Sequence, residues 1–136
     1  MKFYAIVILP PSVDTQSADA VRSAVLALMR PFEAWDSDDP VPPGHRGHWD
    51  GYFCCSREWL LEQDRASDVY SGQEDLVFPV DRVDASGITN ALVTPTGEWH
   101  ESRATYTRED PDWTGKALAL CRAHAGHFGV LLYCHC

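Results

Sequence analysis

Residues 91–101, ALVTPTGEWHE, carry the clearest local structure signal in the chain. Residues 94–97 are typical of a tight hairpin turn. Pro95 presets the backbone at the second turn position, and Gly97 accepts the left-handed conformation that closes the turn. The sequence therefore predicts a β-hairpin whose incoming strand is residues 91–93.

The outgoing strand of this hairpin is expected to begin at Glu98. Because successive side chains of a strand point to opposite faces, Glu98 and His100 should share one face, with Trp99 and Glu101 on the other. A neighbouring carboxylate and imidazole can bind a metal, move a proton or hold a polar ligand. Glu98 and His100, assisted by Glu101, are thus the candidate catalytic residues. The alternative is a hairpin with exposed polar residues and Trp99 packed inward as an anchor.

Working outward towards the N-terminus, residues 3–9 form a continuous apolar run that predicts a central strand. A helix follows, with Asp14 or Ser17 as its N-cap and Pro31 at its end. Its apolar stripe repeats at helical spacing and consists of Val21, Ala24, Val25 and Leu28.

Towards the C-terminus, Asp110 and Pro111 predict the start of a second helix, and Gly126 its end. The inner face of this helix is expected to consist of Trp113, Ala117, Leu120, Cys121 and His124. Residues 128–134 alternate as a terminal strand.

The order of these elements predicts an α+β fold of the ferredoxin-like, split βαβ type: one antiparallel sheet with two helices on one face. The first strand would be central, with the terminal strand beside it. Residues 32–84 exceed the minimal fold and are expected to be an acidic, loop-rich elaboration. Within it, residues 32–47 are a predicted surface loop, 48–59 contain a strand, 62–75 form helix fragments or loop, and 76–83 form an edge strand.

The chain has 136 residues and a hydrophobic share of 45%, enough for a single domain, 1–136, with its own core. No segment approaches the ~18 apolar residues of a membrane span. The apolar start runs into Pro10 and Pro11 without a small-residue cleavage site, so a buried strand explains it better than a signal peptide. Five cysteines, an odd number, do not form a secretory disulfide pattern. A cytoplasmic location is predicted.

The net charge of −9 is concentrated in residues 33–84, which hold 13 acidic residues against four arginines. This distribution argues against direct binding to the nucleic-acid backbone and is compatible with a basic protein partner. A solvated acidic surface is the simpler interpretation.

Cysteine and histidine are plentiful, but no spacing typical of a zinc site is present. Cys134 and Cys136, which share a strand face, are the weak candidates for metal ligands. No metal and no cofactor is predicted, because buried free cysteines usually behave as small apolar residues.

Aromatic and polar residues alternate at 48–59. Aromatic rings offer stacking surfaces, while Asp50 and Arg57 offer directional hydrogen bonds, a combination suited to a base or sugar ring. The predicted ligand site has the hairpin as its opposite wall and consists of Trp49, Asp50, Tyr52, Arg57, Trp99 and His100. The alternative is that the aromatic residues belong to the core and that Asp50 pairs with Arg57.

Four segments carry a resemblance to a known group: residues 3–10 (FYAIVILP), Trp49-Asp50 followed by Arg57, residues 92–101 (LVTPTGEWHE), and Cys134-His135. With them the chain resembles uncharacterised small proteins of actinobacteria and their phages. In that group the Trp-Asp segment runs into a Gly-Gly-Arg-Trp turn, whereas residues 55–58 here are CSRE.

Three functions follow as hypotheses. The first is a non-enzymatic binding protein, a phage accessory or anti-defence factor acting in the host cytoplasm, that binds a basic protein or a nucleotide-like molecule. The second is a small hydrolase or metal-assisted enzyme using Glu98 and His100. The third is a structural homo-oligomer, such as a homodimer formed through sheet edges.

Overall fold

The computed structural model describes residues 1–35, 37–43, 45, 47–62 and 76–136. Within them the chain forms an α+β structure with a mixed, open, six-stranded sheet. The strands are β1 (Lys2–Ile8), β2 (Gly51–Cys54), β3 (Val77–Pro79), β4 (Ala91–Val93), β5 (Trp99–Glu101) and β6 (Phe128–His135). The α-helices of the described part are α1 (Ala18–Met29), α2 (Arg57–Glu62) and α4 (Trp113–Ala123).

The sheet has the strand order β2-β6-β1-β4-β5, and β3 pairs with the beginning of β6. Strand β1 therefore lies in the centre, with Ala5 opposite Leu132 of β6 and Ala91 of β4. Residues 5–8 of β1 are buried on both faces, as their continuous apolar sequence requires. The predicted central first strand and its terminal neighbour are both confirmed.

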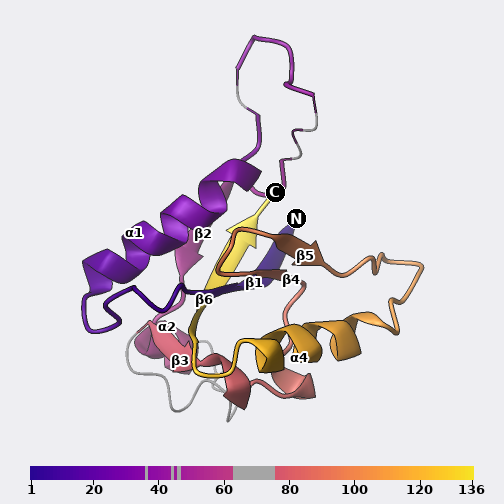
Figure 1. Cartoon of the computed structure of the whole chain (residues 1–136). Coiled ribbons are helices and arrows are strands. Elements are labelled where there is room, and N and C mark those ends of the chain that lie inside the picture. Colours follow the sequence, from indigo (N-terminus) through magenta and orange to yellow (C-terminus); the bar gives the residue numbers. More distant parts are fainter. Residues whose placement is uncertain (36, 44, 46, 63–75) are drawn as a thin grey trace.

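The ferredoxin-like prediction needs correction in two respects. First, β1 and β4 are direct parallel neighbours, so no strand splits the βαβ unit and the sheet is mixed rather than antiparallel. Second, α1 and α4 lie on opposite sides of the sheet (Figure 1), not on one face. The physical reason is that β1 is apolar on both faces: α1 covers Ala5 and Val7, while α4 covers Ile6 and Ile8.

Helix α1 follows the sequence prediction closely. The Ser17 hydroxyl caps it by accepting a hydrogen bond of 3.1 Å from the Ala20 backbone N–H. Val21, Val25 and Met29 are buried against the sheet. The chain then tightens into a 3₁₀ turn, η1 (Arg30–Phe32), that contains the predicted helix-ending proline.

Helix α4 begins later than predicted. The Asp110 carboxylate accepts a hydrogen bond of 2.8 Å from the Arg103 backbone N–H, so it is engaged away from the helix end. Trp113, Ala117 and Cys121 are the buried residues of the helix, in agreement with the predicted inner face. The Trp113 indole N–H donates to the backbone oxygen of Thr89 at 2.8 Å, which ties the helix to the sheet.

The β4–β5 hairpin closes as its sequence predicts. The Gly97 N–H donates to the Thr94 oxygen at 3.0 Å, and Gly97 adopts φ +89°, a conformation that favours glycine. Pairing of Leu92 with His100 and of Val93 with Trp99 puts these two β5 residues on opposite faces.

The predicted middle elaboration contributes to the sheet through β2 and β3, both paired with β6. Strand β3 is shorter than predicted because the chain turns into the 3₁₀ turns η2 (Val80–Arg82) and η3 (Ala85–Gly87). Nearly all of the segment predicted as helix fragments or loop, from residue 63 to 75, lies outside the described residues. Among the helices that are described, none has the length and apolarity needed to cross a membrane.

Candidate functional site

Of the predicted catalytic pair, His100 lies in β5 on the face of the sheet that α4 covers, and Glu98 directly precedes the strand, which begins at Trp99 rather than at Glu98 as predicted. His100 Nε2 and Glu98 Oε2 are 3.3 Å apart, and the Glu98 side chain is largely exposed. Within the described residues, no three His, Cys, Asp or Glu side chains gather closely enough to hold a metal ion. The pair is therefore a surface contact between two side chains that stand two positions apart in the hairpin.

Trp99 points to the other face and is packed among three rings. His48 stacks on it with ring centroids 4.5 Å apart and an interplanar angle of 16°, and Phe3 and Phe32 lie 6.3 and 5.2 Å away. The Trp99 indole N–H donates to Glu101 Oε2 at 3.3 Å. Trp99 is thus the inward anchor that the alternative interpretation of the hairpin describes.

The predicted aromatic–polar segment is also engaged inside the fold. Trp49 is 6% exposed, and its indole N–H donates to the Met29 backbone oxygen at 2.8 Å. Tyr52 lies edge-on to Trp49, with ring centroids 4.9 Å apart, and burial raises its pKa to about 12. Asp50 contacts His135 rather than Arg57, with Oδ1 2.6 Å from Nδ1.

The two walls of the predicted ligand site touch only where His48 meets the hairpin, and the predicted ligand residues are not gathered into one site. Strands β2 and β5 form opposite edges of the main path of the sheet, so Tyr52 and His100 are separated by three strands and lie on different faces. Arg57 is exposed at the start of α2. His48, next to the buried Trp49, is the residue that reaches across to Trp99.

Three of the five cysteines are buried, and Cys54 is half-buried with a thiol pKa that burial also raises. Burial raises the pKa of Cys134 and Cys55 to about 12 and that of Cys121 to about 11. Cys136, by contrast, is exposed. A thiol that resists ionisation is a poor nucleophile and a poor metal ligand near neutral pH.

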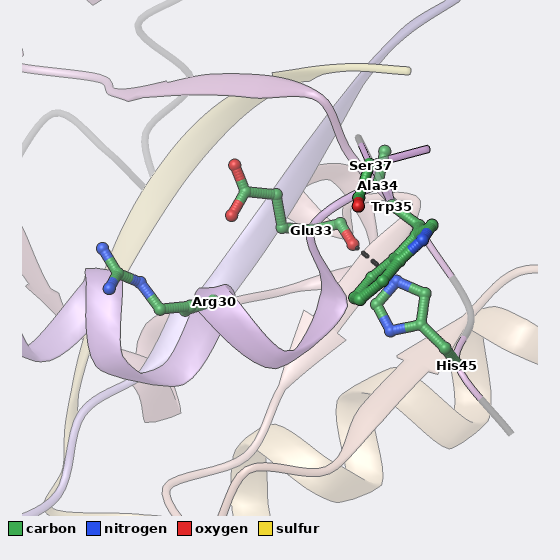
Figure 2. A pocket seen from close by; sticks show the side chains of 6 residues that line it. All are labelled: Arg30, Glu33, Ala34, Trp35, Ser37 and His45. Atoms are coloured by element: carbon green, nitrogen blue, oxygen red, sulfur yellow. Dashed lines mark hydrogen bonds between the residues drawn. The ribbon is translucent and has the colours of Figure 1, made fainter. Parts of the chain in front are cut away.

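A cavity of about 410 Å³ lies where α1 passes through η1 into the following segment (Figure 2). This volume is within the usual range of ligand pockets. In Figure 2 the rings of Trp35 and His45 lie together at one end and Arg30 at the other, with the Glu33 side chain between them. The lining residues are Arg30, Glu33, Ala34, Trp35, Ser37 and His45.

A second hollow of about 330 Å³ adjoins the first and shares residues 33–35 with it. Asp50 completes its lining. Among the described residues, its lining therefore contains one indole ring and two acidic side chains, those of Glu33 and Asp50, and no basic side chain. We call this the Glu33–Asp50 hollow.

The backbone around both hollows is held by contacts between residues far apart in sequence. The Ala34 N–H donates to the Trp49 oxygen and the His48 N–H to the Phe32 oxygen, both at 2.7 Å. Gly47 makes this crossing feasible, because a Cβ atom at that position would lie 2.7 Å from Ala34 Cα.

Trp35 is oriented although it is exposed. Its indole N–H donates to the Asp39 backbone oxygen at 3.0 Å, and the edge of His45 contacts its ring with centroids 5.3 Å apart. His45 is itself fixed, because its Nε2 lies 3.0 Å from the Glu33 backbone oxygen and must donate to it. A 40% exposed tryptophan held in one orientation is a ready stacking surface.

Two charges at these hollows lack partners among the residues that the structure describes. Across the described residues, neither the Arg30 guanidinium nor the Glu33 carboxylate makes a hydrogen bond or an ion pair. Both act electrostatically on Tyr52. The hollows thus combine an exposed indole with two charges of opposite sign that no described residue pairs.

The sequence-based prediction missed these residues, because residues 32–47 appear to be an ordinary surface loop. The available signal was Trp35, a large aromatic residue among acids and prolines, where no periodic apolar pattern could bury it.

Comparison with known proteins gives no relative: no family model, no curated protein and no solved structure matches this chain.

Proposed function

We propose that this protein is a non-enzymatic binding protein that takes a basic protein partner at the Glu33–Asp50 hollow. The observation that carries the proposal is the exposed, oriented indole of Trp35, which lines the same hollow as the acidic residues Glu33 and Asp50, with no basic residue among the described lining residues. Under this proposal the protein acts as an accessory or anti-defence factor that occupies a basic surface.

The chemistry of the hollow suits a cation. An aromatic face attracts a positive charge through its quadrupole, and a nearby carboxylate adds an ion pair. Asp38 and Asp39 extend the negative charge along the same exposed segment. A net charge of −9 also speeds the approach of a basic partner.

Fluorescence anisotropy with a labelled lysine- and arginine-containing peptide tests the proposal. We expect binding that weakens with increasing salt, no binding of a matched glutamine peptide, and an affinity about tenfold lower in Trp35→Ala. Tyr106→Ala is the matched control, because Tyr106 is a fully exposed aromatic residue remote from the hollow in sequence. Equal loss in both variants, or no binding at low salt, contradicts the proposal.

A nucleotide-like ligand is the second candidate, and the larger cavity favours it. There the Arg30 guanidinium, which has no ion-pair partner among the described residues, can meet a phosphate while Trp35 stacks on a base, and Ser37 adds a hydroxyl. Nucleoside monophosphates in a thermal-shift assay test this candidate. A stabilisation that Arg30→Gln abolishes supports it, and the absence of any shift at millimolar ligand excludes it.

A further inference from the structure

Resting on the proposed function, we infer that the Glu33–Asp50 hollow is an arginine site: it takes the guanidinium group of an arginine side chain in preference to the ammonium group of lysine. Two features of the hollow favour a guanidinium: its flat indole surface and its carboxylate acceptors, which need N–H donors on the ligand.

The hollow combines a flat surface with acceptors contributed by two different segments. Trp35 supplies the ring, Glu33 follows η1, and Asp50 precedes β2. A guanidinium is planar, so it can lie on an indole face while its N–H groups donate in its own plane towards more than one carboxylate. An ammonium is a compact, strongly hydrated charge and gains less from a flat surface.

Asp50 and the Trp35 ring are held before any ligand arrives. Asp50 is fixed through its backbone N–H, which donates to the His135 oxygen at 2.8 Å, and through Oδ1, which lies 2.6 Å from His135 Nδ1. Its Oδ2 makes no hydrogen bond with any described residue. Trp35 is fixed through its bond to the Asp39 oxygen. Preorganisation of this kind favours a rigid, planar ligand group over a flexible one.

The larger cavity next to the Glu33–Asp50 hollow disfavours a second cation, so that a bound cation is expected in the hollow alone. Arg30 lines the larger cavity and has no ion-pair partner among the described residues, so it repels a second positive group. The two hollows together therefore fit one arginine of the partner in the Glu33–Asp50 hollow. The partner group that faces Arg30 should accept hydrogen bonds, as a backbone carbonyl or an acidic side chain does.

Three peptides that differ at one central position test the inference on the intact protein. The central residue is arginine, lysine or citrulline, and the flanking basic residues are identical. Citrulline keeps the planar shape of arginine and removes its charge. We expect the arginine peptide to bind about tenfold more tightly than the lysine peptide, and the citrulline peptide to bind more weakly than the arginine peptide.

Single substitutions show which residues cause the preference for arginine over lysine. Trp35→Ala and Asp50→Asn should each reduce the ratio of arginine to lysine affinity towards one, whereas Asp81→Asn, an exposed acid in η2, should leave it unchanged. Equal affinity of the arginine and lysine peptides for the native protein overturns the inference and leaves the proposed function standing. Failure of all three peptides to bind overturns the proposed function as well. The peptide comparison on the native protein needs no variant to fold.

Discussion

In the β4–β5 hairpin, Trp99 is covered by Phe3, Phe32 and His48, whereas Trp35 in residues 33–50 stands 40% exposed beside two hollows. Both tryptophans have a glutamate two positions away. Glu101 accepts from the Trp99 indole N–H, and one of its oxygens lies 3.7 Å from His48 Nδ1. Glu33 makes no such contact with any described residue.

The difference separates structural from ligand-binding uses of the same residue types. A carboxylate oxygen that already has a partner in its own chain adds to the stability of the fold and is not available to a ligand. A carboxylate oxygen beside an exposed ring that has no partner among the described residues, such as Oδ2 of Asp50 or the oxygens of Glu33, remains available. The hairpin is therefore a structural element, and the 33–50 segment is the candidate binding region.

The largest expected effect comes from replacing each tryptophan with alanine and comparing the two losses of stability. We expect Trp99→Ala to lower the free energy of unfolding by about 2–3 kcal/mol, because a half-buried indole with three aromatic neighbours is lost. Urea denaturation monitored by circular dichroism measures this loss.

Trp35→Ala is the matched variant and should change the free energy of unfolding by no more than about 0.5 kcal/mol, since its ring is exposed. Its effect should appear in peptide binding instead. If the two variants lost the same stability, the comparison between the hairpin and the 33–50 segment would fail.

The sequence was informative wherever local chemistry decides structure. The turn at Gly97, the Ser17 cap and the apolar stripe of α1 each depend on neighbouring residues, and all three are found as predicted. The order of the strands depends on which strand of the hairpin pairs with β1 and on which face each helix covers. Those choices are settled by long-range packing, such as the contact of Trp113 with Thr89.

The candidate site could not be predicted for the same reason. Trp49 and Trp35 lie in one polar, aromatic-rich region, yet Trp49 is buried because Met29, 20 positions earlier, offers its backbone oxygen to the indole. Asp50 was predicted as a ligand-binding residue, with a pair to Arg57 as the alternative, and it meets His135 near the other end of the chain. Both contacts join residues that are far apart in the sequence, and no sequence pattern indicates that they pair.

A smaller loss of stability is expected when the turn of the β4–β5 hairpin is altered, and it tests whether that turn determines the hairpin. Gly97 has φ +89°, so Gly97→Ala should cost about 1–2 kcal/mol of stability through backbone strain. Gly115→Ala in α4 is the control. Gly115 has nothing within 4 Å of its added Cβ, and alanine there should stabilise the helix by about 0.5–1 kcal/mol. Thermal unfolding of the two variants should shift in opposite directions, and a neutral Gly97→Ala would show that the turn does not determine the hairpin.

The smallest effect is expected for His100→Ala. The contact of His100 with Glu98 is 3.3 Å long, but the Glu98 side chain is 67% exposed, and an ion pair in such a position contributes less than about 1 kcal/mol. Peptide binding should be unchanged, because His100 faces the α4 side of the sheet while Trp35 does not share its strand, its face or its cavity. A hydrolase that uses Glu98 and His100 makes the opposite prediction: hydrolysis of ester or phosphoester substrates by the native protein and its loss in His100→Ala. A loss of peptide affinity in His100→Ala equal to that in Trp35→Ala would reverse the assignment of the two regions.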